Sequence, residues 1–409
     1  MGKIINYLLR GSVLALLALP AFAQSSDQII NNCENPDPDI SMPACTTIID
    51  GGPEIGAYLF EAYVNRSVAE AKKGMFTQAI SDDTQAIALN PANARILLNR
   101  ARAYEATGSY APAIADTSRS IELDPSNADA YRLRGIAEAS SGLWDAAIAD
   151  QTKAIAIAPR DPQAYWARAM AHGAQHQLGA ALADLNSVIA LSPANSKALA
   201  ARGSLFMEMN HPDLALPDLN KALALDPENV DAGVTLGLYY GAKGLWTQEI
   251  TQLSKMLQTG RYSPQGYFAI YTNRATAYES QGLYAQALPD ETMAISLDPK
   301  NPMLWNNRCW SRAHTGDLQG ALSDCKQALA ISPNDPEILD SAGFVYLKMH
   351  DNKASIANYA AALKLNPQLA SSLYGRALAE QAMGDKTAAE ADFAAAARID
   401  PDIDSHFGT

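Results

Sequence analysis

The feature that most constrains this chain is a period of 34 residues. When the chain is aligned on the glycines that precede Ala-Ile or Ala-Leu pairs, ten consecutive segments share one register, and nine of them are 34 residues long. The sixth segment carries four additional residues. The segments begin at Phe60, Ala94, Ala128, Pro162, Ser196, Val230, Phe268, Pro302, Pro336 and Ala370. Such a period is typical of solenoids, in which neighbouring repeats stack and bury each other's apolar faces.

Four positions within the repeat predict its local structure. Position 8 is small in all ten repeats and position 20 is Ala in eight, which predicts two closely packed helices. Position 32 is Pro in nine repeats and is expected to end the second helix. Position 15 is Gly in seven repeats and otherwise His176, Asn210 or His350, residue types that tolerate the left-handed backbone of a turn. The pattern therefore predicts an all-α, superhelical solenoid of about ten helix hairpins.

These repeats resemble the tetratricopeptide repeat family over roughly Phe60 to Ile403. The resemblance implies antiparallel helix pairs and a concave groove that is lined by the first helix of each repeat. It also implies a binding or scaffolding role without an active site. Position 7 departs from the family pattern, because it is mostly Arg here where the family usually has Leu.

Positions 7 and 23 vary together within the chain. The same eight repeats have Arg at position 7 and Asp at position 23, and the two repeats without Arg also lack Asp. In an antiparallel hairpin these positions come side by side, so we predict a repeated ion pair, with separate solvent-exposed charges as the alternative. The predicted pairs are Arg66–Asp82, Arg100–Asp116, Arg134–Asp150, Arg168–Asp184, Arg202–Asp218, Arg274–Asp290, Arg308–Asp324 and Arg376–Asp392.

The first 23 residues have the order of a secretory signal peptide. Lys3 and Arg10 precede a short apolar run, and Ala21, Phe22 and Ala23 form a small-x-small cleavage signal. The run is too short to span a bilayer, and no later segment is expected to do so. We therefore expect a soluble exported protein, and a periplasmic one if the source is Gram-negative.

The repeats set the expected organisation of the rest of the chain. The expected segments are the signal peptide at 1–23, an N-terminal cap at 24–56, repeats one to six at 57–267, repeats seven to ten at 268–403, and a tail at 404–409. Gly260, Pro264 and Gly266 predict a hinge at 258–267, and a tolerated loop insertion is the alternative. The tail is too short for a further capping helix, so the last apolar face is expected to be partly exposed or covered by another molecule.

Charge and composition limit the classes of partner. The net charge is −13, and −15 once Lys3 and Arg10 are removed, which disfavours nucleic acid and anionic membrane surfaces. We found no phosphate-binding loop, nucleophile elbow or catalytic carboxylate pair, so the chain is predicted to be no enzyme and to need no cofactor. His172 and His176 have a spacing that suits zinc, but His176 falls in the turn and no further ligand is near. No metal site is predicted.

The four cysteines form two close pairs. Cys33 and Cys45 flank a Pro-rich stretch, and a bond between them would close the cap. Cys309 and Cys325 occupy positions 8 and 24 of one repeat, where the two helices are expected to be closest. Both pairs are predicted disulfides, and buried free thiols are the alternative for the second pair.

The family resemblance also implies which side chains line the groove, namely those at positions 2, 5, 6, 9, 12 and 13. The lysine and asparagine that clamp a carboxylate in some family members are missing, and the asparagine row at position 6 is broken. The candidate groove residues are Arg95, Asn99, Arg102, Arg132, Ile136, Trp166, Met170, Met207, Leu238, Asn273, Asn306, Asn307, Trp310, Phe344, Leu347 and Tyr374.

The expected function is a non-catalytic scaffold or adaptor that binds protein or peptide segments in this groove. Large apolar residues such as Trp166, Met170, Trp310 and Phe344 would anchor a partner if they are exposed, and would simply pack on neighbouring helices if they are not. The alternative is a structural component of an envelope or secretion assembly that associates with itself, so a homo-oligomer remains possible.

Overall fold

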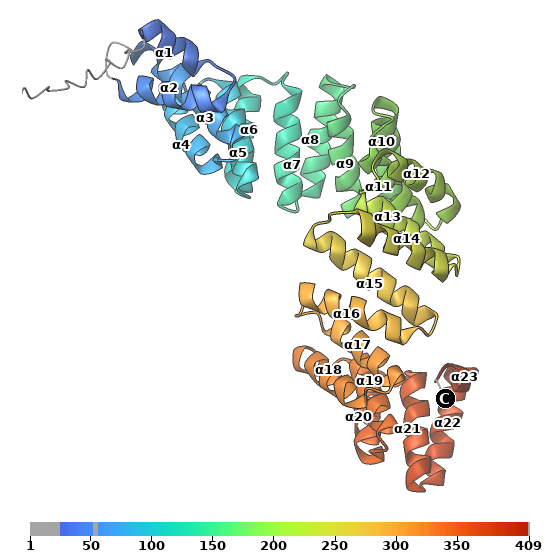
Figure 1. Ribbon diagram of the computed structural model, residues 1–409. Coiled ribbons are helices and arrows are strands. Elements are labelled where there is room, and N and C mark those ends of the chain that lie inside the picture. Colours follow the sequence, from blue (N-terminus) through green and yellow to red (C-terminus); the bar gives the residue numbers. More distant parts are fainter. Residues whose placement is uncertain (1–24, 52–55, 408–409) are drawn as a thin grey trace, which may run out of the picture. The chain divides into compact units, whose positions relative to one another are not determined.

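The computed structural model describes residues 25–51 and 56–407, and the regular structure in these ranges is entirely helical (Figure 1). The predicted signal peptide lies outside the described residues. The chain divides into two compact units, Met1–Gln177 and Leu178–Thr409, and each unit is described by itself. Within the described ranges, no helix combines the length and the apolar character that a membrane crossing needs.

Unit 1 begins with two cap helices and continues with the hairpins of the first repeats. In each repeat we call the two helices the first and the second helix. The helices of unit 1 are α1 (Ser26–Cys33), α2 (Pro38–Asp50), the 3-10 helix η1 (Gly56–Tyr58), α3 (Leu59–Lys72), α4 (Phe76–Leu89), α5 (Ala94–Ala106), α6 (Tyr110–Leu123), α7 (Ala128–Ser140), α8 (Trp144–Ile157) and α9 (Pro162–Ala174).

Unit 2 continues the series and ends with one very short helix. Its helices are α10 (Leu178–Leu191), α11 (Ser196–Glu208), α12 (Pro212–Leu225), α13 (Val230–Ala242), α14 (Trp246–Thr259), α15 (Pro264–Ser280), α16 (Tyr284–Leu297), α17 (Pro302–Thr315), α18 (Leu318–Ile331), α19 (Pro336–Lys348), α20 (Asn352–Leu365), α21 (Ala370–Met383), α22 (Lys386–Ile399) and α23 (Ile403–His406).

The turn at position 15 has the predicted left-handed backbone. The seven glycines at this position have φ between 70° and 88°. His176, Asn210 and His350 adopt φ values of 55°, 59° and 61°, so the three exceptions in the sequence use the same conformation. Side chains at position 34 cap most of the first helices that follow them, as Asn127 does for α7.

Position 8 marks the closest approach of the two helices in a hairpin. A Cβ atom added to Gly203 would lie 2.7 Å from the Leu219 side chain at position 24, and one added to Gly135 would lie 3.1 Å from the carbonyl oxygen of Ala147 at position 20. Positions 20 and 24 of the second helix therefore face position 8 of the first helix. A larger side chain at position 8 would push the two helices apart. The same register places Cys309 against Cys325, whose sulfur atoms form a disulfide with a Cα–Cα distance of 5.4 Å.

The predicted ion pair joins the two helices of seven hairpins in the described part of the chain. In each pair Nε and Nη2 of the arginine donate to the two carboxylate oxygens of the aspartate at 2.5–2.9 Å. The aspartates are largely buried. The eighth pair, Arg168 with Asp184, has one residue in each unit and stays a prediction.

The arginine also contacts the preceding repeat, a contact that we did not predict. In six repeats its Nη1 donates to the side-chain oxygen at position 25 of the preceding second helix, which is Thr, Ser or Asn. One example is the 3.0 Å bond from Arg100 to Thr84. A single guanidinium group therefore links three helices, and this explains why Arg replaces the usual Leu at position 7.

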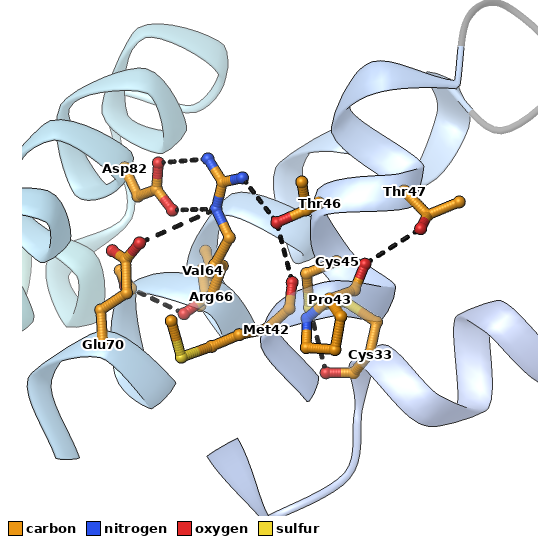
Figure 2. The surroundings of a disulfide bond; sticks show 11 residues. Cys33, Met42, Pro43, Cys45, Thr46, Thr47, Val64, Arg66, Glu70 and Asp82 are labelled. Carbon is orange, nitrogen blue, oxygen red and sulfur yellow. Dashed lines mark hydrogen bonds and ion pairs between the residues drawn. A yellow bond between two sulfur atoms is a disulfide. The ribbon is translucent and has the colours of Figure 1, made fainter. Parts of the chain in front are cut away.

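The N-terminal cap copies this arrangement. Figure 2 shows Arg66 between Asp82 of α4 and Thr46 of α2, to which it donates a 3.0 Å bond. Cys45, the residue before Thr46, forms a disulfide with Cys33 of α1. The helix α2 therefore takes the place of a preceding second helix, and the disulfide holds it in a hairpin with α1.

The four inserted residues of the sixth repeat lengthen a helix. The helix α15 starts at Pro264, one turn before Phe268, so Gly266 lies inside the helix and the break is confined to residues 260–263. Leu253, Met256 and Ile270 form one buried cluster across this break. The predicted hinge at 258–267 stays a prediction that these contacts do not test.

Candidate functional site

Two of the side chains predicted to line a groove, Asn99 and Arg102, lie in a pocket of unit 1. The pocket, which we call the Asp83 pocket, has a volume of about 360 Å³. Val68, Ala71 and Lys72 of α3 form one wall, and Asn99 and Arg102 of α5 form the other. These residues occupy positions 9, 12 and 13 of one first helix and positions 6 and 9 of the next. The pocket therefore lies between adjacent first helices, where the sequence placed Asn99 and Arg102.

Asp83 lies at the base of this pocket, at position 24 of the first repeat. It is 1% exposed and accepts a 2.6 Å hydrogen bond from the Ser67 hydroxyl. Burial raises the pKa of the Asp83 carboxyl to about 7, although Ser67 and Arg100 favour its charged form. The base of the pocket is therefore a buried carboxyl group that Ser67 holds by its hydroxyl. We had not singled out Asp83, although position 24 is mostly apolar or uncharged elsewhere.

The predicted basic residues of unit 1 are largely neutralised by neighbours. Asp129 on α7 pairs with both Arg102 and Arg132, and Arg132 also lies 3.7 Å from Asp161. Arg95 is exposed. Arg102, at the wall of the Asp83 pocket, is therefore already paired with a neighbouring carboxylate.

The middle candidates differ in exposure. Met170 is 41% exposed and Trp166 is half-buried on α9, so both reach the surface of unit 1. In unit 2, Met207 packs at the edge of a buried cluster of α11, α12 and α13. The Asn273 amide donates to the carbonyl of Ala269 in its own helix, and Asn307 is half-buried. These contacts leave no continuous row of asparagines for a peptide backbone.

A second pocket lies between α19 and α21 of unit 2. This Phe407 pocket has a volume of about 430 Å³ and is lined by Phe344, Leu347 and Lys348 of α19 and by Leu378 of α21, with Phe407 at one side. Phe344, Leu347 and Lys348 occupy positions 9, 12 and 13 of the ninth repeat, and Leu378 occupies position 9 of the tenth. The same repeat positions therefore form a pocket in each unit, and larger apolar side chains line the second one.

A row of stacked rings leads to the Phe407 pocket. The ring of His314 lies 4.2 Å from that of Tyr284 and 4.6 Å from that of Trp310, measured between centroids. The Trp310 ring in turn stacks on Phe344 at 4.7 Å. Trp310 and Leu347 are partly buried against this cluster and keep surface exposed. Aromatic rings packed in this way form a rigid apolar surface.

Phe344 itself is not the exposed anchor that we considered. It is 2% exposed, because Trp310 and His314 stack on its ring and Phe407 of the C-terminal segment packs edge-on against it with a centroid distance of 5.6 Å. Ile403 of α23 is buried as well. The expected open apolar face after the last repeat is therefore covered by the chain itself. The 34-residue period could not show this, because Phe407 lies outside the repeats.

Comparison with known families and structures agrees with this architecture. A family profile described as tetratricopeptide repeat matches residues 64–128, 113–162, 272–336 and 342–402, which together make up more than half of the chain. A second profile with the same description matches residues 196–229. No match was found among curated proteins.

Several solved structures match this chain at low sequence identity. A tetratricopeptide repeat protein from Parabacteroides merdae is 19% identical with a TM-score of 0.48, and the match covers 62% of this chain and 98% of that one. YrrB, described as a tetratricopeptide repeat protein with an unusual peptide-binding site, is 19% identical with a TM-score of 0.42 over 47% of this chain and 97% of its own. The repeat domain of P58(IPK) is 18% identical with a TM-score of 0.29, over 80% and 98%.

Proposed function

We propose that this chain, which belongs to the tetratricopeptide repeat family, is a non-catalytic scaffold that holds segments of other proteins against its first helices. Proteins of this family are generally scaffolds for protein interactions, and they bind proteins or peptides. We further propose that the binding surface consists of positions 6, 9, 12 and 13 of adjacent first helices.

One observation carries this proposal. The Asp83 pocket and the Phe407 pocket lie far apart in the sequence, in different units, and yet the same repeat positions form their walls. Packing of a hairpin uses positions 7, 8, 20, 23 and 24, so it does not require hollows at positions 9, 12 and 13. A surface that is repeatedly hollow and partly apolar suits an extended or helical partner segment.

The two pockets suit different parts of a partner. In the Asp83 pocket, apolar Val68 and Ala71 surround a polar base with Lys72 at the rim, which suits side chains that combine an apolar body with a hydrogen-bonding end. The Phe407 pocket is built from Phe344, Leu347 and Leu378, which suits aliphatic or aromatic side chains. We infer that one partner or two partners could use these surfaces, with specificity set by the side chains that enter them.

The compartment is part of the proposal. All four cysteines form disulfides, and such bonds persist in oxidising, exported environments. Together with the predicted signal peptide, this supports an exported protein, periplasmic in a Gram-negative source. The acidic net charge of −13 supports protein partners over nucleic acid. Self-association is the less favoured function, because Ile403 and Phe407 cover the face on which it would rely.

Affinity capture with face-specific variants tests the proposed surface. Val68→Arg and Leu347→Arg place a large charge in the two pockets, whereas Leu89→Arg and Leu365→Arg place it at exposed ends of second helices. We expect at least one pocket variant to lose a partner that the wild type and both control variants recover from the source cells. Equal recovery by all four variants would remove the assignment of the binding surface.

A further inference from the structure

The short helix α23 departs from the pattern of the array. Each earlier second helix of unit 2 is followed by a first helix that packs along it, as α21 packs on α20. In contrast, α23 has only four residues and packs mainly against the first helix α21. The three residues that separate it from α22, Asp400, Pro401 and Asp402, form a sharp turn. The segment therefore comes to lie on the face that we propose for partners.

Two side chains hold this segment in place. Ile403 is 7% exposed in a cluster with Leu363, Leu373 and Ala396. Four residues later, Phe407 is also 7% exposed, and its ring centroid lies 5.1 Å from that of Tyr374. An aliphatic residue followed four residues later by an aromatic one is the spacing of two anchors on one face of a helical turn. Docked helices use the same spacing when they bind in grooves.

Phe407 fills only part of its pocket. About 430 Å³ remains beside the ring, bounded by Leu347, Leu378 and Ala382, and pockets that hold ligands typically measure about 300–1,000 Å³. If Phe407 only closed the hydrophobic core at the end of the array, close packing would leave no such space beside its ring. The remaining volume is large enough for further side chains of a segment that enters from solvent.

The charges around the pocket complement the segment. Lys348 lines the pocket, and its ammonium group lies 5.3 Å from the centre of the Phe344 ring. The segment contains the exposed acidic residues Asp402 and Asp404. The pocket therefore offers an apolar floor and a cationic rim, which favour an aromatic side chain carried by an acidic segment.

We propose that Phe407 is an internal ligand of the site between α19 and α21, and that the external ligand is an acidic protein segment with an aliphatic residue four positions before an aromatic one. This inference rests on the proposed function and names the partner's chemistry at one of its two pockets. The partner's aromatic ring takes the place of Phe407 on Phe344 and Tyr374. The chain then binds its partner by exchange of one ring for another.

The tether gives the internal ligand a high effective concentration. A short linker keeps Phe407 near its pocket, so an external segment competes with a group that is always present. The apparent affinity for the external segment falls in proportion to the fraction of molecules in which Phe407 has left the pocket. Removal of the Phe407 ring is therefore expected to raise the affinity for a competing segment, provided that the pocket itself stays intact.

A peptide with the sequence of residues 400–407 tests the exchange. We would measure its binding by fluorescence anisotropy to the full chain in three forms, namely wild type, Phe407→Ala and Phe407→Leu. The control variant is Ser405→Ala, which alters the exposed side of α23 and leaves both anchors and both acidic residues in place. We expect Kd to fall at least about tenfold from wild type to Phe407→Ala, less for Phe407→Leu, and not at all for Ser405→Ala.

A second peptide, in which Ala replaces the final Phe, is expected not to bind any form. Addition of Leu378→Arg to either Phe407 variant is expected to abolish binding of the first peptide. Phe407→Leu retains an apolar side chain over Phe344, so the test stands even if Phe407→Ala lowers stability. Two results would overturn the inference. One is equal peptide affinity for wild type and both Phe407 variants, and the other is peptide binding to the Phe407 variants that Leu378→Arg does not weaken.

The outcome is distinguishable from failure of the proposed function. If the Leu347→Arg variant loses its partner but the peptide does not bind the Phe407 variants, the scaffold function stands and the internal ligand is wrong. If the peptide binds the Phe407 variants but no form of the chain recovers a partner, the site exists and the scaffold function is wrong.

Discussion

The guanidinium group of Arg308 donates hydrogen bonds of 2.8 and 2.9 Å to the two carboxylate oxygens of Asp324. Both residues are buried, with exposed fractions of 9% and 2%, and they come directly before the disulfide-bonded Cys309 and Cys325. Two adjacent positions of the first helix are thus joined to two adjacent positions of the second. In the other hairpins with an ion pair, packing of a small residue at position 8 replaces the disulfide.

The buried pair leads to a stability prediction. Arg308→Ala removes two donors of the Asp324 carboxylate, while Arg312 Nη1 remains 2.8 Å from it. The loss of one partner of a buried pair typically costs about 3–5 kcal/mol, and we expect a loss at the lower end because Arg312 stays. Replacement of both residues, Arg308→Met with Asp324→Leu, is expected to cost less than the single change because the buried carboxylate is removed as well. The free energy of unfolding in urea measures both. Arg119→Ala, which removes an exposed pair with Glu122, is the control and is expected to change stability by less than about 0.5 kcal/mol.

Buried carboxyl groups predict how stability depends on pH. Burial raises the pKa of Glu70, Glu138 and Glu249 to about 7, and burial with the neighbouring Glu279 raises that of Glu291 to about 9. In the unfolded chain these groups titrate near 4.5, so the folded protein binds more protons between that pH and the raised values. The free energy of unfolding therefore falls as the pH rises from about 5 to 9.

Thermal melts at several pH values test this slope. Glu291→Gln imitates the protonated carboxyl and keeps its hydrogen-bonding shape beside Ser311. We expect this variant to lose less stability between pH 5 and 9 than the wild type does. A melting temperature that rises with pH over this range would contradict the assignment of raised pKa values.

The first disulfide predicts a local effect on the cap. The variant Cys33→Ser with Cys45→Ser removes the bond between α1 and α2, and closure of a loop of this length typically contributes about 2–3 kcal/mol. Because Arg66 still bonds to Thr46, we expect α2 to keep part of its protection while α1 loses most of it. Hydrogen exchange resolves the two helices. Equal loss in both would show that the arginine bond does not hold α2.

The left-handed turns predict opposite outcomes for two substitutions. Gly142 has φ +78° and no atom within 4 Å of an added Cβ, so Gly142→Ala meets no clash and its cost is purely conformational. We expect a loss of about 1 kcal/mol. Asn210 already has a left-handed backbone with φ 59°, so Asn210→Gly is expected to be neutral or slightly stabilising. Urea unfolding compares the two directly.

The sequence predicts those parts of the fold that repeat. Small residues, prolines and turn residues return every 34 positions, so one physical explanation covers ten hairpins, and the joint loss of Arg and Asp revealed the ion pair. The bond from Arg100 to Thr84 was missed because position 25 is not constant: it is Thr, Ser or Asn in seven repeats and Lys326, Ala360 or Ala394 in the other three. Thr, Ser and Asn look like ordinary surface residues in a sequence, although they share an oxygen that accepts a hydrogen bond.

The candidate site was predicted less well because its details do not repeat. Asn99, Arg102 and Leu347 line pockets as the family resemblance implied. We considered that Phe344 could be exposed, but it is buried and in contact with Phe407. Phe407 lies outside the 34-residue repeats, so the period could not predict this contact. Position 24 is uncharged in eight repeats, and Asp83 and Glu291 are its two acidic exceptions. Departures from the period, more than the period itself, therefore distinguish one pocket from the next.

Site-specific photocrosslinking tests the central claim, that partners bind the face of the first helices. A photoreactive amino acid would replace Val68, Met170 or Leu347 on that face, and Leu143 or Leu365 as controls that are exposed elsewhere. We predict that crosslinks to a shared partner form in the source cells from at least one of the first three positions and from neither control. Crosslinks to that partner from the control positions alone would contradict the account.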